Sequence, residues 1–136
     1  ISEAALEQAV IDLMSLTNDR ALNIAVMPQR LIVPVELWAE AEKILKTTQE
    51  VGTANNTVNV VRSKFPKGVA VNHYLTDTDA WFIRTNVRDG MKYFVRREDT
   101  FDMDDDFDTD NAKYKATFRC AFGWSDPRGL FGSVGA

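Results

Sequence analysis

Carboxylates dominate one short stretch of the chain and are its most concentrated candidates for chemistry. Between Glu98 and Asp110 there are eight acidic residues and no basic residue. Alternating carboxylates could ligate calcium, but a calcium loop also needs glycine at its sixth position and glutamate at its twelfth. Counted from Asp102, those positions hold Phe107 and Lys113. The tract therefore favours a solvated or partner-facing loop, because consecutive like charges repel unless a partner pairs them.

Side chains suited to nucleophilic or metal chemistry are scarce elsewhere. His73 is the only histidine, so neither a two-histidine zinc pattern nor a catalytic triad has support. The single cysteine, Cys120, lies between Phe118 and Phe122, where we expect a buried residue that acts as a small hydrophobe. The glycines are too scattered for a phosphate-binding loop. We predict no catalytic, metal or cofactor-binding residue, and a protein that is not an enzyme.

Charge is unevenly distributed along the chain, whose net charge is −4. Outside the acidic tract, 12 acidic and 16 basic residues leave a mildly basic body. The basic stretch Arg62, Lys64 and Lys67 offers too few charges for more than weak phosphate binding, so we interpret it as a solvated face or an intersubunit ion pair. This asymmetry favours attraction between copies of the chain over nucleic-acid binding, which needs a concentrated basic face.

Two predicted strands would position the acidic tract. Residues Lys113 to Trp124 alternate between apolar and polar side chains, which is the period of a half-buried strand. An earlier strand, Met91 to Arg97, precedes the tract, so we expect one long hairpin with an anionic tip. Such an arm suits contact with other protein. The apolar side of the later strand carries Tyr114, Ala116, Phe118, Cys120, Phe122 and Trp124.

Two helices and several shorter strands are predicted before this hairpin. A helix from Ser2 to Asn18 has Ser2 as its N-cap, and Pro34 marks the first position of a second helix. The order of helices and strands predicts an α+β fold. The predicted short extended segments and strands are Leu22–Met27, Gln29–Val33, Val58–Lys64, Val69–Asn72 and Ala80–Thr85. The expected core residues include Leu6, Ala9, Val10, Leu13, Met14, Thr17, Leu37, Trp38, Ala41, Ile44, Leu45, Trp81 and Trp124.

Length and composition fit one domain or two small lobes. The chain has 136 residues, of which 45% are hydrophobic, the usual share for a globular protein. The longest apolar runs, such as Leu31 to Val35, are far below the roughly 18 residues of a membrane span. No secretion signal is evident, and a single cysteine excludes an internal disulfide.

Three segments, taken in order, resemble a known family. They are Leu31–Leu37, the turn and aromatic strand Leu75–Ile83, and Gly123–Gly129 after the long strand. Their order is similar to that in the C-terminal part of tailed-bacteriophage and prophage major capsid proteins of the Hong Kong 97-like fold. The resemblance implies a backbone helix packed on long antiparallel strands plus a small mixed axial lobe. It assigns residues 1–20 and 91–136 to the peripheral domain and residues 21–90 to the axial domain.

The function that the resemblance implies is structural. It is that of a capsid subunit, made in the bacterial cytoplasm and located in the virion, that forms an icosahedral head shell around DNA. The implied partners are other copies of the chain, with scaffold and non-specific contact with packaged DNA, and no membrane. The possible intersubunit contacts are Asp102, Asp104, Asp105, Asp106, Asp108 and Asp110.

Two further expectations complete the sequence analysis. A different class of function stays open, a small ligand- or metal-binding module that uses the acidic tract at residues 98–110. Because the chain begins at Ile1 without an initiator methionine, we expect a fragment that is monomeric or weakly associating by itself.

Overall fold

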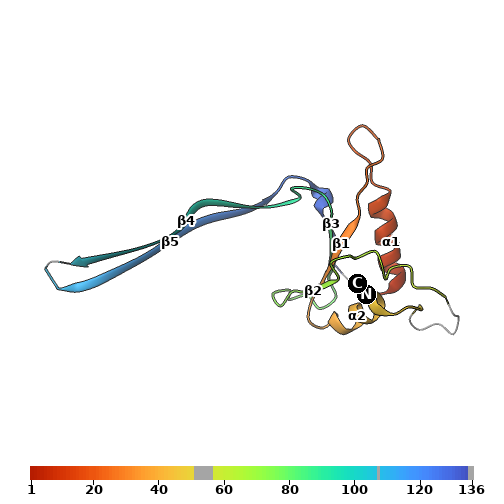
Figure 1. The fold of residues 1–136 in the computed structure, drawn as a ribbon, viewed down its shortest axis with the longest axis horizontal. Coiled ribbons are helices and arrows are strands. Elements are labelled where there is room, and N and C mark those ends of the chain that lie inside the picture. Colours follow the sequence, from red (N-terminus) through yellow and green to blue (C-terminus); the bar gives the residue numbers. More distant parts are fainter. Residues whose placement is uncertain (51–56, 107, 135–136) are drawn as a thin grey trace. The chain divides into compact units, whose positions relative to one another are not determined.

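The computed structural model describes residues 1–50, 57–106 and 108–134, and the chain divides into two compact units (Figure 1). The first unit comprises Ile1–Arg88 and Pro127–Ala136, and the second comprises Asp89–Asp126. Both described helices belong to the first unit, and the second is a pair of long strands. This mixture of helices and strands confirms the α+β class.

A four-stranded sheet forms the centre of the first unit. Its strands are β1 (Pro28–Val33), β2 (Val69–Val71), β3 (Trp81–Thr85) and β6 (Leu130–Ser133). The strand order is β2-β1-β3-β6, with β1 parallel to β2 and all other neighbours antiparallel. Leu31 pairs with Ile83, and both side chains are fully buried. The period of two thus places one face of the central strands in the core.

The edge strand β6 was not predicted from the sequence. It follows a 3-10 turn, Pro127–Gly129, whose Arg128 carbonyl accepts a 2.8 Å hydrogen bond from the buried Thr85 hydroxyl. Within β6, Gly132 pairs with Phe82, and a Cβ at this glycine would lie 2.7 Å from the Phe82 ring. The absence of a side chain at Gly132 therefore lets the Phe82 ring lie across the neighbouring strand.

The first helix, α1 (Glu3–Met14), is shorter than the predicted helix from Ser2 to Asn18. Ser2 is its N-cap, as expected, and its hydroxyl accepts a 3.3 Å hydrogen bond from the Ala5 amide. The helix ends at Met14 with Ser15 as its C-cap, and the predicted stripe residues beyond Leu13 are exposed. The buried residues of α1, which are Leu6, Ala9, Val10 and Leu13, belong to the core that contains the inward side chains of β1 and β3.

The structure places the buried stripe of α1 in the core of the first unit. The expectation that this backbone helix packs on the long antiparallel strands stays a prediction. A stripe of apolar residues specifies that a helix has an inward face without specifying the surface that it covers. The two compact units of the structure, Ile1–Arg88 with Pro127–Ala136 and Asp89–Asp126, thus have other boundaries than the two predicted domains. The peripheral role of residues 1–20 with 91–136 and the axial role of residues 21–90 stay predictions.

The second helix, α2 (Trp38–Lys46), begins four residues after the predicted start at Pro34. Pro34 is instead fully buried directly after β1, and its missing amide hydrogen suits the end of a strand. Ala41, Ile44 and Leu45 are buried as predicted. Trp38 is 52% exposed and is therefore not a core anchor, because it stands in the first turn rather than on the inward face.

The segment that was predicted as a strand from Val58 to Lys64 is an irregular turn. Its organising residue is the buried Asn59, whose amide group donates to the Ile44 carbonyl at the end of α2. The Asn59 side-chain oxygen accepts from the amides of Val61 and Arg62, at 2.9 and 3.1 Å. One side chain therefore satisfies backbone groups of two segments, and this favours the turn over an extended strand.

We expect Asn59→Ala to lower the free energy of unfolding by about 2–3 kcal/mol, because buried backbone groups would lose their partners. Urea denaturation followed by circular dichroism measures this loss. Asn72→Ala is the matched control, since the Asn72 side chain accepts from the Tyr74 amide at an exposed position. A loss at Asn59 no larger than that of the control would contradict the organising role.

The second unit is one hairpin of two long antiparallel strands, β4 (Met91–Asp106) and β5 (Asn111–Trp124), which run side by side (Figure 1). The long hairpin was predicted, but the acidic tract was expected to be a loop. Instead, β4 continues through Glu98 to Asp106, and residues 108–110 form a turn before Asn111. Within residues 1–50, 57–106 and 108–134, neither helix has the length and apolar character that crossing a membrane would require.

Candidate assembly interface

The β4–β5 hairpin has one apolar face along its length. Side chains on directly paired residues project from the same face of a strand pair. On one face, Met91 pairs with Trp124, Tyr93 with Phe122 and Val95 with Cys120, and the series continues toward the tip with Phe101 opposite Ala116 and Met103 opposite Tyr114. The alternation of β5 adds Phe118 to this set. We call these eleven residues, Met91, Tyr93, Val95, Phe101, Met103, Tyr114, Ala116, Phe118, Cys120, Phe122 and Trp124, the apolar face.

Aromatic contacts hold parts of the apolar face together without covering it. The rings of Tyr93 and Phe122 lie 5.1 Å apart, and those of Phe101 and Tyr114 stack at 6.0 Å. Such pairs stabilise a two-stranded ribbon. Nevertheless, Phe122 is 82% exposed and Trp124 is 79% exposed. The face therefore offers a row of large apolar side chains to a partner.

Three predictions about this strand are corrected by the structure. The strand from Lys113 to Trp124 was expected to be half-buried, but most of its side chains are exposed. Trp124 is not a core anchor, and Cys120 is half-buried rather than buried. The period of two correctly separated the side chains into two faces. It could not show whether a further layer of protein covers one of them.

Tyr93 and Cys120 interact across the two strands. Hydrogen bonding to the Cys120 side chain is the main cause that raises the pKa of the Tyr93 phenol above its ordinary value, and Asp99 contributes in the same direction. The raised pKa favours the protonated phenol, so Tyr93 contributes a neutral aromatic side chain to the apolar face.

The opposite side of the hairpin, which we call the charged face, pairs acidic with basic residues near its tip. Asp102 lies opposite Lys115, and Asp104 lies opposite Lys113. Opposite charges at directly paired positions stabilise a strand pair by roughly 0.2–1 kcal/mol each. The lysines of β5 thus compensate part of the acidic tract. This explains why a run of carboxylates continues as a strand where the local sequence favoured a loop.

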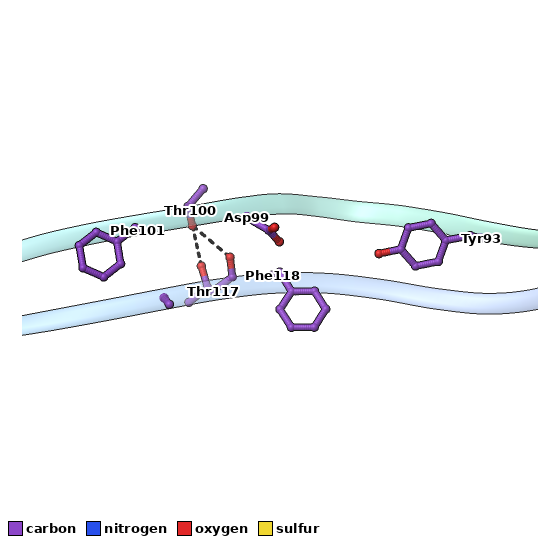
Figure 2. A pocket seen from close by; sticks show the side chains of 7 residues that line it. Tyr93, Asp99, Thr100, Phe101, Thr117 and Phe118 are labelled. Atoms are coloured by element: carbon purple, nitrogen blue, oxygen red, sulfur yellow. Dashed lines mark hydrogen bonds between the residues drawn. The ribbon is translucent and has the colours of Figure 1, made fainter. Parts of the chain in front are cut away.

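The register of the two strands shifts in the middle of the hairpin. The shifts fall between Val95 and Arg97 and between Arg97 and Thr100, where β4 uses more residues than β5. Beyond them, the Thr100 hydroxyl lies 2.7 Å from the Thr117 hydroxyl, as Figure 2 shows. Irregularities of this kind bend and twist a strand pair. In this part of the hairpin, a shallow hollow is lined by Tyr93, Asp99, Thr100, Phe101, Ala116, Thr117 and Phe118 (Figure 2).

The predicted intersubunit residues lie at the outer end of the hairpin. Asp102, Asp104 and Asp105 are exposed on β4, and Asp106 is the last residue of that strand. Asp108 and Asp110 are exposed in the turn. Strand alternation sends Asp105 to the side opposite Asp102 and Asp104, so their carboxylates do not converge. Over the part of the chain that the structure describes, no group of three or more potential metal ligands occurs.

Other polar candidates are dispersed over the first unit. His73 is exposed in a turn that follows β2. The basic residues Arg62, Lys64 and Lys67 are exposed as well, and they lie in turns rather than on a strand face. Among the described residues, the hairpin is therefore the surface on which apolar and charged side chains are arranged in the longest continuous pattern.

Comparison with known proteins identifies the family. A family model described as phage capsid protein matches residues 2–133. The chain belongs to the phage capsid protein family. The prediction of a phage capsid protein, made from Leu31–Leu37, Leu75–Ile83 and Gly123–Gly129, is thus confirmed.

The fold of this phage capsid protein is also similar to that of a solved structure. The crystal structure of a virus-like particle from Pyrococcus furiosus matches with a TM-score of 0.54 and 13% identity, over 95% of this chain and 48% of that chain. At this identity the likeness concerns the fold, and the chain spans about half the length of that protein. No curated protein matches.

Sequence reasoning did not assign the five β4 residues of the apolar face to that face. The β4 residues Met91, Tyr93 and Val95 alternate in the sequence, and Phe101 and Met103 alternate again farther on. The register shifts between the two groups break the pattern, so the second group was included in the acidic loop. The signal that could have found them was the resumption of alternating large side chains inside the acidic tract.

Proposed function

We propose that this chain is part of a structural subunit of a bacteriophage or prophage capsid with the Hong Kong 97-like fold. The proposed subunit forms an icosahedral head shell around DNA, is made in the bacterial cytoplasm and resides in the virion. Membership of the phage capsid protein family supports this proposal, and so does the fold similarity to a virus-like particle. A structural role, rather than a catalytic one, follows from the same proposal.

The observation that carries the proposal is the exposed apolar face of the β4–β5 hairpin. Nine of its side chains are large apolar residues that are each more than half exposed to solvent. Burying such surface contributes about 25 cal/mol per Å² of apolar area. Extended exposed apolar surfaces of this kind mark sites of contact with other protein. We infer that another copy of the subunit covers this face in the assembled capsid.

The proposed partners follow from this arrangement. Copies of the subunit assemble into capsomers, with scaffold and non-specific contact with packaged DNA as further proposed partners. Within the assembly, the acidic residues Asp102, Asp104, Asp105, Asp106, Asp108 and Asp110 are proposed intersubunit contacts. The alternative, a ligand- or metal-binding module at residues 98–110, has weaker support, because strand alternation disperses the carboxylates over two sides.

Sedimentation velocity over a wide concentration range tests the proposal. We expect the isolated chain to be monomeric or weakly associating at micromolar concentration and to associate reversibly as the concentration approaches the millimolar range. The hairpin should supply the interaction. A chain that stays monomeric at every concentration, with and without a crowding agent, would contradict the proposed self-assembly.

A further inference from the structure

The middle of the hairpin places like charges opposite each other. Arg97 pairs directly with Arg119 on the charged face. Like charges at directly opposed positions destabilise a strand pair. Together with Arg96 they line an open hollow whose other lining residues are Thr117 and Phe118. Two arginines in this position weaken the free hairpin, and this arrangement suits the binding of an anion.

The arginines have no acidic partner on the described part of the chain. Neither of the ion pairs in the first unit, Lys46–Glu42 and Arg128–Asp19, involves them, and none of the three guanidinium groups forms another one among residues 1–50, 57–106 and 108–134. Asp99 is close in sequence, but it lines the other hollow, next to Tyr93. The positive charge at Arg96, Arg97 and Arg119 is therefore available to a partner.

The complementary charge is at the outer end of the same hairpin. Asp105 lies opposite Ala112, and Asp108 and Asp110 are exposed in the turn, so these carboxylates lack the directly opposed lysines of Asp102 and Asp104. Arg119 is six residues from Lys113 along β5, or about 20 Å at the rise of a strand. A hairpin cannot fold its own tip back over that distance while its strands stay paired. The tip must come from another copy.

We propose that the acidic tip of one copy, with Asp105, Asp108 and Asp110, binds the arginine hollow formed by Arg96, Arg97 and Arg119 of a second copy. This inference rests on the proposed self-assembly and names the contact that directs it. Tip and hollow are different surfaces, so the contact is head-to-tail, and repetition around a rotation axis closes a ring of subunits.

Nucleic acid fits the same hollow less well. Three arginines neutralise few phosphates, and a DNA strand along the ribbon would meet the acidic residues Asp102 and Asp104 on the same face. A compact acidic turn avoids that repulsion because it reaches the hollow end-on. Charge complementarity therefore favours a second copy of this chain.

Two complementary variants of the full chain test the contact by sedimentation velocity at low salt. R97Q/R119Q removes the hollow and keeps the tip, and D105N/D108N/D110N removes the tip and keeps the hollow. We expect each variant alone to associate more weakly than the unchanged chain, by about tenfold or more in Kd. An equimolar mixture should associate more strongly than either variant alone, since an intact tip then meets an intact hollow.

Stability and charge controls separate the contact from a folding defect. R97Q/R119Q relieves like-charge repulsion, so its melting temperature should be equal to or above that of the unchanged chain. R62Q/K64Q removes the same charge from exposed positions of the first unit and should leave association unchanged.

Three results would overturn the inference. If the unchanged chain associates and both hairpin variants associate equally well, the proposed contact between tip and hollow is wrong. The proposed function as a capsid subunit is not contradicted by that result. If R97Q/R119Q weakens the binding of duplex DNA and leaves association of the copies unchanged, the anionic partner is nucleic acid. If the unchanged chain does not associate at any concentration, the proposed function fails together with the inference.

Discussion

Replacing Phe118 and Phe122 together by serine should abolish self-association of the chain while leaving its folding stability nearly unchanged. The two side chains belong to the apolar face and are 66% and 82% exposed, so the free chain derives little burial from them. In an interface, each buried ring contributes about 1.5–3 kcal/mol. Loss of both should therefore raise Kd by roughly 100-fold or more. Sedimentation velocity measures the association, and thermal denaturation measures the stability.

Tyr74→Ser provides the matched control for F118S/F122S. Tyr74 is 93% exposed but lies in a turn of the first unit and is not a residue of the hairpin. Its loss should change neither association nor melting temperature. Equal association of F118S/F122S and the unchanged chain would show that the apolar face of the hairpin does not mediate contact between copies.

Ile83→Ala should lower the free energy of unfolding by about 3–4 kcal/mol, the largest stability effect that we expect for a single substitution. Ile83 is fully buried on the central strand β3, opposite the equally buried Leu31. Removing most of its side chain leaves a cavity that the four-stranded sheet cannot easily close. Urea denaturation of the first unit, followed by tryptophan fluorescence of the buried Trp81, measures the loss.

Phe122→Ala is the contrasting control for this core substitution. It removes a larger apolar side chain, but from an exposed position, and should cost less than about 0.5 kcal/mol. A comparable loss at both positions would mean that the hairpin contributes to the folded core, which would contradict the division into a packed unit and an exposed ribbon.

The sequence was sufficient to predict the two faces of β5, because a period of two depends only on local geometry. It also predicted the inward residues of the helices, such as Leu6, Leu13 and Ile44, which are buried. Burial of a strand face depends on other layers of the protein, which periodicity does not reveal. Cys120 and Trp124 were therefore assigned to the correct face and wrongly expected to be buried.

Long-range pairing explains the other differences. The acidic tract was predicted as a loop from local repulsion, but Lys113 and Lys115 lie opposite Asp104 and Asp102 and favour a strand. The direct opposition of Arg97 and Arg119 depends on register shifts that no local pattern specifies. Asn59 was one polar residue in a predicted strand, and its role depends on a carbonyl fifteen residues away. In each case the deciding partner is distant in sequence.

Electron microscopy of the concentrated chain under crowding conditions tests the central claim most directly. We predict ordered assemblies, either rings or curved lattices, in which neighbouring copies meet along the β4–β5 hairpin. F118S/F122S should give no such assemblies under the same conditions. Monomers or amorphous aggregates alone, or an ordered lattice in which the hairpins contact no neighbour, would contradict assembly of a capsid subunit through this hairpin.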